Sequence, residues 1–187
     1  YLNCSLTAEI FATGKCVAKI SAVKEQFRYI KAKTLVFDDQ EEVKKAYEKG
    51  KLNRNVIIVV RYQGPKANGM PELHSLTPML SNVQDLGFKV ALLTDGRMSG
   101  ASGKILAAIH VTPEAIDNGV IGKIEDDDEI EIDANNGKLN ILTDISKRKN
   151  SLLNDMKKNQ SFGRNIFNTL RIHSQGSEEG GGIKLID

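Results

Sequence analysis

Hydrophobic positions between residues 33 and 94 follow two different periods, which is the pattern of alternating strands and helices. Residues 34–37 are β-branched and apolar, and Asp38 and Asp39 after them offer an N-cap and first-turn carboxylates to a helix expected over 39–48. Residues 55–62 are almost continuously apolar, as in a strand covered on both faces. Helical spacing returns over 73–86, and a second buried strand is expected over 89–94.

The second half of the chain has shorter elements. Strands are expected over 107–111, 129–133 and 138–142, and the turn residues Asn135, Asn136 and Gly137 favour a hairpin between the last two. Pro113 marks an expected helix start, and a polar Lys/Asn-rich helix is expected beyond Asp144, leading to 161–172. These units predict an α/β domain on a mixed sheet with surrounding helices, with a barrel-like closed sheet as one form of it.

Two unusual loops follow the two buried strands. Residues 63–72 contain two glycines and two prolines, so no regular element is expected there, and residues 95–103 contain three glycines. Folds of this class bind ligands at the carboxyl ends of their strands, so both loops are candidate site loops.

The loops carry the candidate chemistry. The first loop and the residues just after it offer the polar side chains Lys66, Asn68, Glu72 and His74, and the second loop offers Asp95, Arg97, Ser99 and Ser102. The three glycines of the second loop expose backbone amides that suit an anion or developing negative charge. A purely structural role for both loops stays open as an alternative. Glycine-rich connections are common, and a carboxylate before a helix often serves as its cap or first-turn acid.

The histidines, the cysteines and the acidic run do not indicate a further binding site. His74 and His110 are expected to be surface or packing residues, and Cys4 and Cys16 have the spacing of neither a disulfide framework nor a zinc site. The acidic run 126–129 is expected to be a solvated turn, because it lacks the alternating ligands and the glycine of a calcium loop.

Composition narrows the class of protein. The chain has 187 residues with 26 basic and 24 acidic side chains, which fits one globular domain and disfavours nucleic acid as a partner. Its longest apolar run is five residues, far below the roughly 20 that cross a bilayer, and no signal peptide opens the chain. A cytoplasmic protein is therefore expected, without a membrane partner.

A family resemblance lies in the two loops and their setting. Residues 59–115, VVRYQGPKANGMPELHSLTPMLSNVQDLGFKVALLTDGRMSGASGKILAAIHVTPEA, resemble the C-terminal domain of the dihydroxy-acid and 6-phosphogluconate dehydratases. Residues 14–23 and 163–167 are similar to its opening and closing segments. The motifs ANGMPELH and AIHVTPEA resemble those of the 6-phosphogluconate branch of the family. The resemblance implies that residues 1–187 are one C-terminal domain, of swivelling type, from a longer enzyme.

The resemblance implies a hydro-lyase of gluconate metabolism. Family members take the C2 proton of a 2,3-dihydroxy acid, expel the C3 hydroxyl and form a 2-keto acid. For 6-phospho-D-gluconate the product is 2-keto-3-deoxy-6-phosphogluconate, in the Entner–Doudoroff pathway. Ser99 falls on the family's proton-abstracting serine and Glu72 on a magnesium ligand, while Lys66, Arg97 and Gly100 are candidates for binding the substrate's carboxylate or phosphate. In the same hypothesis the Asp95 side chain shapes its loop instead of joining the chemistry.

Cofactors and partners are likewise implied only by the resemblance. They are Mg²⁺ and a 4Fe–4S cluster whose ligands belong to an N-terminal domain outside this chain, so the chain's own cysteines are not expected to bind it. The isolated domain is expected to be inactive, and the full-length enzyme to be a homodimer. Three alternatives stay open: a dihydroxy-acid dehydratase domain, a dehydratase of unphosphorylated sugar acids, and a non-catalytic binding module.

Overall fold

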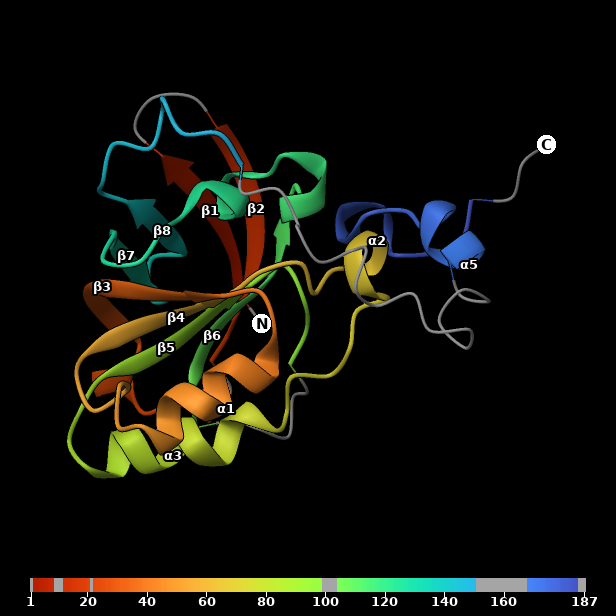
Figure 1. Ribbon diagram of the computed structural model, residues 1–187. Coiled ribbons are helices and arrows are strands. Elements are labelled where there is room, and N and C mark those ends of the chain that lie inside the picture. Colours follow the sequence, from red (N-terminus) through yellow and green to blue (C-terminus); the bar gives the residue numbers. More distant parts are fainter. Residues whose placement is uncertain (1, 9–11, 21, 99–103, 151–167, 185–187) are drawn as a thin grey trace.

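The protein is an eight-stranded closed barrel flanked by helices in a computed structural model that describes residues 2–8, 12–20, 22–98, 104–150 and 168–184 (Figure 1). The strands lie in the order β1-β2-β6-β5-β4-β3-β7-β8. Their bounds are β1 Leu2–Ala8, β2 Ala12–Lys19, β3 Tyr29–Phe37, β4 Val56–Val60, β5 Val90–Thr94, β6 Leu106–Thr112, β7 Glu129–Asp133 and β8 Lys138–Ile141. This architecture confirms the predicted α/β class with a mixed, barrel-like sheet.

Parallel pairing joins β3, β4, β5 and β6, whereas β2, β7 and their neighbours add antiparallel pairs. A parallel pairing of β1 with β8 closes the ring. Because β3 to β6 all point the same way, the segments that follow them leave the barrel at one end. The two predicted site loops are two of these segments.

Helices α1 (Gln40–Glu48) and α3 (Leu76–Asp85) cover the outer face of the parallel strands (Figure 1). Asp39 caps α1, as its sequence position predicts, and accepts a 2.8 Å hydrogen bond from the Glu41 N–H. On another side of the barrel lie α2 (Pro65–Asn68) and α5 (Asn168–Ile172). Short 3₁₀ turns complete the fold: η1 Glu25–Phe27, η2 Ala115–Asp117, η3 Val120–Lys123 and η4 Ser177–Glu179.

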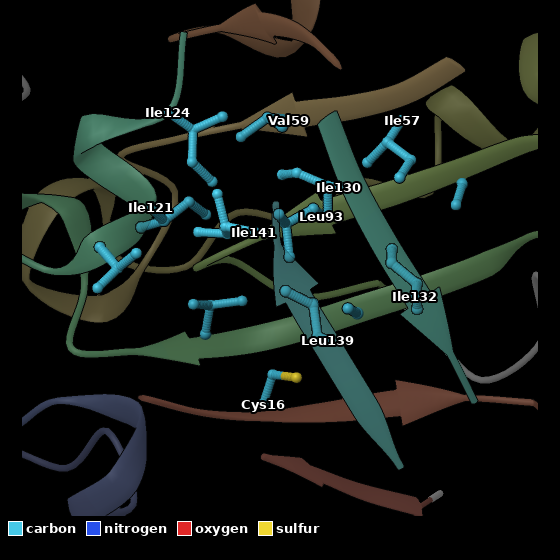
Figure 2. Packing of buried hydrophobic residues seen from close by; sticks show 14 of the residues in the cluster. Cys16, Ile57, Val59, Leu93, Ile121, Ile124, Ile130, Ile132, Leu139 and Ile141 are labelled. Carbon is cyan, nitrogen blue, oxygen red and sulfur yellow. The ribbon is translucent and has the colours of Figure 1, made fainter. Parts of the chain in front are cut away.

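Two apolar cores lie on the two sides of the barrel wall. Inward side chains fill the barrel, among them Ile57, Leu93, Ile132 and the thiol-bearing Cys16 (Figure 2). Outward side chains of the same strands, including Ile58 and Leu92, form a second core with side chains of α1 and α3, including Leu76 and Leu80 of α3. Burial on both faces explains why β4 and β5 read as continuous apolar runs.

Two strands were not predicted, and two expectations are wrong. Strands β1 and β2 were not expected from their sequence, and loop 63–72 contains the one-turn helix α2. That helix begins after Gly64 with Pro65 at its first position and ends at Gly69, whose φ is +68°. The glycines and the proline that were expected to prevent regular structure therefore mark the ends of the helix. Pro113 follows a cis peptide bond and precedes the turn η2 instead of opening a helix.

The acidic run is also less solvated than expected. Asp128 is buried and receives two hydrogen bonds from the Arg148 guanidinium, at 2.5 and 2.9 Å. This pair raises the pKa of Arg148 and ties residues after β8 to the turn before β7. Residues 144–150 form turns and irregular chain, and the rest of the predicted polar helix lies outside the described residues up to α5. No helix in the described part of the chain is long and apolar enough to span a membrane.

Candidate functional site

The two candidate loops pack directly against each other. Glu72 and Arg97 form an isolated parallel β-bridge, and the Leu73 N–H donates to the Arg97 carbonyl at 3.2 Å. Near the start of the second loop, a Cβ on Gly96 would lie 2.6 Å from the Cβ of Gln63, so a glycine there lets the loops approach this closely. The structure therefore brings Glu72 and Arg97 together, as expected for two loops of one site.

Glu72 is held by backbone contacts and does not cap a helix. Helix α3 begins at Leu76 after Ser75, so Glu72 lies upstream of its first turn. The Arg97 Nε donates to the Met70 carbonyl at 3.1 Å and lies 3.8 Å from the Glu72 Oε2. The Glu72 side chain is 34% exposed, so its carboxylate combines a fixed position with access to a ligand. The alternative in which Glu72 is a helix cap or first-turn acid is wrong.

Asp95 organises the loop backbones. Its buried carboxylate accepts N–H bonds from Tyr62 and Gln63, which follow β4, at 3.0 and 2.8 Å, and from Ala115 at 3.1 Å. Burial raises the pKa of Asp95 to about 6, although the N–H donors act in the opposite direction. The expectation that Asp95 shapes the loop is confirmed.

Glu114 is a second buried acid that the sequence interpretation did not single out. It is 1% exposed, and its Oε2 accepts the N–H of Lys66 at 3.2 Å. Burial, followed by the charge of Asp95, raises the pKa of Glu114 to about 7. Gly64 leaves room for it, because a Cβ on Gly64 would lie 2.1 Å from the Glu114 Oε2. No local sequence signal distinguishes this glutamate from an exposed one.

Lys66 makes its contacts on another side of the loop. Its Nζ lies 2.7 Å from the Asp117 Oδ2 in η2, and this pairing raises the pKa of Lys66. Helix α2, which carries it, packs against η2 and α5. The first loop thus presents Glu72 toward Arg97 and Lys66 toward Asp117.

Two further basic or titratable side chains lie near Glu72 and Arg97. Lys19, the last residue of β2, is 1% exposed, and burial lowers its pKa while the charge of Glu72 raises it. His110 on β6 is half-buried, and burial together with Arg97 lowers its pKa. His110 was expected to be a surface or packing residue, and its sequence position alone gives no sign of this neighbourhood.

The described residues contain no preassembled cluster of metal ligands. No group of three or more His, Cys, Asp or Glu side chains that could hold a metal ion lies within the described ranges. Glu72 offers an oxygen ligand of the type that Mg²⁺ prefers, and its partial exposure fits one protein ligand among several. The Cys16 thiol is buried inside the barrel (Figure 2). Ser99 and Gly100 lie outside the described residues.

Comparison with known proteins places these loops in a family. A sequence model described as "Dihydroxy-acid/6-phosphogluconate dehydratase C-terminal" matches residues 4–181. The phosphogluconate dehydratase of Helicobacter pylori strain J99 is 48% identical over 182 residues, covering 92% of the chain and 30% of the relative. That of Zymomonas mobilis is 56% identical over 129 residues, covering 69% and 21%.

A relative with another name is also similar. The dihydroxy-acid dehydratase of Campylobacter lari is 44% identical over 138 residues, covering 72% of the chain and 24% of the relative. The chain thus spans less than a third of the length of each of these three curated relatives. Since the family model matches nearly the whole sequence, the chain belongs to the C-terminal domain family of the dihydroxy-acid and 6-phosphogluconate dehydratases.

Proposed function

We propose that this chain is the C-terminal domain of a phosphogluconate dehydratase, a hydro-lyase that converts 6-phospho-D-gluconate to 2-keto-3-deoxy-6-phosphogluconate and water. Relatives that cover about nine-tenths of the chain carry that name. The observation that carries the proposal is the β-bridge between Glu72 and Arg97, which joins the two family loops into one surface. The reaction would belong to the Entner–Doudoroff pathway in the cytoplasm.

The chain's own residues would bind the substrate and move its C2 proton. Ser99 is proposed to remove that proton, and its role rests on the family motif TDGRMSG. Arg97 is half-exposed beside Glu72 and suits the substrate carboxylate, since a guanidinium binds a carboxylate through paired donors. The amides around Gly100 would face negative charge that develops as the proton leaves. Loss of the C3 hydroxyl then gives an enol, which converts to the keto acid.

Glu72 is proposed as one Mg²⁺ ligand, with the remaining ligands supplied outside the described residues. Magnesium and a 4Fe–4S cluster, when bound, would supply positive charge for the enolate-like transition state and for the departing hydroxyl. Because Cys16 is enclosed in the barrel, the cluster ligands are proposed to belong to an N-terminal domain of the full-length protein. The domain would then complete its active site against that partner, in a homodimer.

Lys66 is proposed to meet the substrate from the side of the loop opposite Glu72. Its ammonium is 2.7 Å from Asp117, so it would contact a carboxylate or phosphate while still paired. This pairing leaves Arg97 as the better-placed group for the carboxylate. Lys66 then becomes the better candidate for the more distant phosphate.

A dihydroxy-acid dehydratase is the second candidate, favoured by the relative from Campylobacter lari. Dehydratases of unphosphorylated sugar acids and a non-catalytic binding module are further alternatives. Rates of keto-acid formation from 6-phosphogluconate, gluconate and a branched 2,3-dihydroxy acid separate the enzyme candidates. Absence of product from all three, in protein with full cluster content, would favour the binding module.

The direct test uses anaerobically prepared full-length protein with 6-phosphogluconate. Wild type is expected to form the keto-deoxy acid, and Ser99→Ala and Glu72→Gln to lose activity by about 100-fold or more while keeping the cluster. Glu48→Gln, an exposed position on α1, is the matched control and should match wild type. Near wild-type activity in Ser99→Ala would show that Ser99 is structural and the proposed mechanism wrong.

A further inference from the structure

His110 is the extra residue of a β-bulge. Strand β6 pairs with β2 so that Ile109 faces Val17 and Thr112 faces Lys15, and the register shifts between these pairs. Two residues of β6, His110 and Val111, therefore lie opposite one residue of β2. Bulges of this kind redirect a side chain from the strand's regular alternation and are frequent beside active sites.

The backbone at His110 is in the left-handed region, with a φ of +54°. Residues other than glycine take a positive φ uncommonly, although asparagine, aspartate and histidine do so more often than the rest, so contacts with the surrounding structure help to fix this conformation. The second site loop stabilises this backbone conformation, because the His110 N–H donates to the Gly96 carbonyl at 2.9 Å. The bulge and the loop that carries Arg97 are thus one hydrogen-bonded unit.

The imidazole of His110 is available to a ligand. It is half-buried, lies close enough to Arg97 to feel its charge, and makes no hydrogen bond to the protein among the described residues. Burial and the charge of Arg97 lower its pKa, which favours the neutral form of the imidazole. A neutral imidazole can donate a proton from one nitrogen and accept one at the other.

We propose that His110 is a further catalytic residue of the dehydration, which carries the proton needed to convert the enol into the keto acid. This inference rests on the proposed function. The imidazole accepts the proton of the enol C2 hydroxyl as the C2 carbonyl forms, and the resulting imidazolium delivers a proton to C3. One proton is taken and one is returned, so the ring ends neutral and no co-reactant is needed.

The other described groups around the loops fit this step less well. Arg97 stays protonated and cannot accept a proton, and Glu72 is proposed to bind magnesium. Lys19 is 1% exposed and so is closed to a substrate. Of these four described side chains, His110 is the one that combines partial exposure with a ring nitrogen that can accept a proton.

The test is turnover of 6-phosphogluconate in D₂O by full-length holoenzyme carrying His110→Asn, with His74→Asn as the matched control. Asparagine tolerates a positive φ, so the variant removes the imidazole while keeping the bulge. We expect kcat to fall about 100-fold with cluster content and KM little changed, and deuterium at C3 to change from one face to both. Added imidazole should restore part of the activity of His110→Gly.

The outcomes separate the two claims. No keto acid from wild type overturns the proposed function and this role with it. Product from wild type together with a kcat within about threefold of it in His110→Asn overturns the role of His110 alone. Deuterium already equal on both faces in the wild-type product also overturns the proton-carrier role.

Discussion

Replacing Glu114 by glutamine should remove most of the pH dependence of the free energy of unfolding. Glu114 is 1% exposed, and its Oε1 has no hydrogen-bond partner among the described residues. Burial is the main cause that raises its pKa from 4.5 to about 7, and the charges of Asp95 and Asp117 act in the same direction. Glutamine has the shape of the protonated acid and keeps an acceptor for the Lys66 N–H.

The sign and size of the effect follow from linkage. An acid whose pKa is raised on folding contributes its stability fully below the unfolded pKa of 4.5, and this stability is lost as the pH rises through about 7. The difference of about 2.5 in pKa corresponds to about 3 kcal/mol in total, of which about 2 kcal/mol falls between about pH 5.5 and about pH 8.5. Asp95, with its pKa raised to about 6, adds about 1 kcal/mol over the same range.

Urea unfolding of the 187-residue chain at about pH 5.5 and about pH 8.5 measures this directly. The free energy of unfolding of wild type should decrease by about 3 kcal/mol across the range, and that of Glu114→Gln by about 1 kcal/mol. Glu48→Gln, at an exposed position, is the control and should behave as wild type. Equal decreases in wild type and Glu114→Gln would refute the reasoning, because Glu114 would then ionise without a folded-state cost.

The other predictions concern the same buried carboxylates. Asp95→Asn should lower the free energy of unfolding by about 2–4 kcal/mol in urea, because an amide cannot accept all three backbone N–H bonds that the carboxylate accepts. Gly64→Ala should cost about 1–3 kcal/mol, since its Cβ would lie 2.1 Å from the Glu114 Oε2. In a Glu114→Ala background that cost should shrink, and an undiminished cost would locate the strain elsewhere.

Elements whose apolar pattern reflects burial by near neighbours could be predicted from the sequence. The runs at 55–62 and 89–94 became β4 and β5 because both faces of these strands are covered. Helix α1 was predicted to within one residue because Asp39 caps it through a local contact. Each of these signals is contained within about ten consecutive residues.

Strand β2 lacks such a signal. Its inward residues Cys16 and Ala18 are small, and its partners β1 and β6 give it a place in the barrel that no local pattern records. The bulge at His110 could not be predicted for the same reason, because a residue is recognised as extra only once β6 is paired with β2. Helix α2 was excluded on composition, although Pro65 and Gly69 are favourable at its two ends.

The meeting of the two candidate loops was predictable because parallel strands send their following loops to one end of a barrel. The hydrogen bonds that hold these loops in place were not predictable, because they join residues of different loops. Glu114 follows β6, yet it accepts the N–H of Lys66 after β4, and Asp95 after β5 accepts from residues of both neighbouring segments. A substitution at Glu114 therefore acts on the loop that carries Lys66 and Glu72, 42 or more positions away in the sequence. Residues that hold the site are identified by their burial and hydrogen bonds, whereas residues that face the substrate are identified by motif.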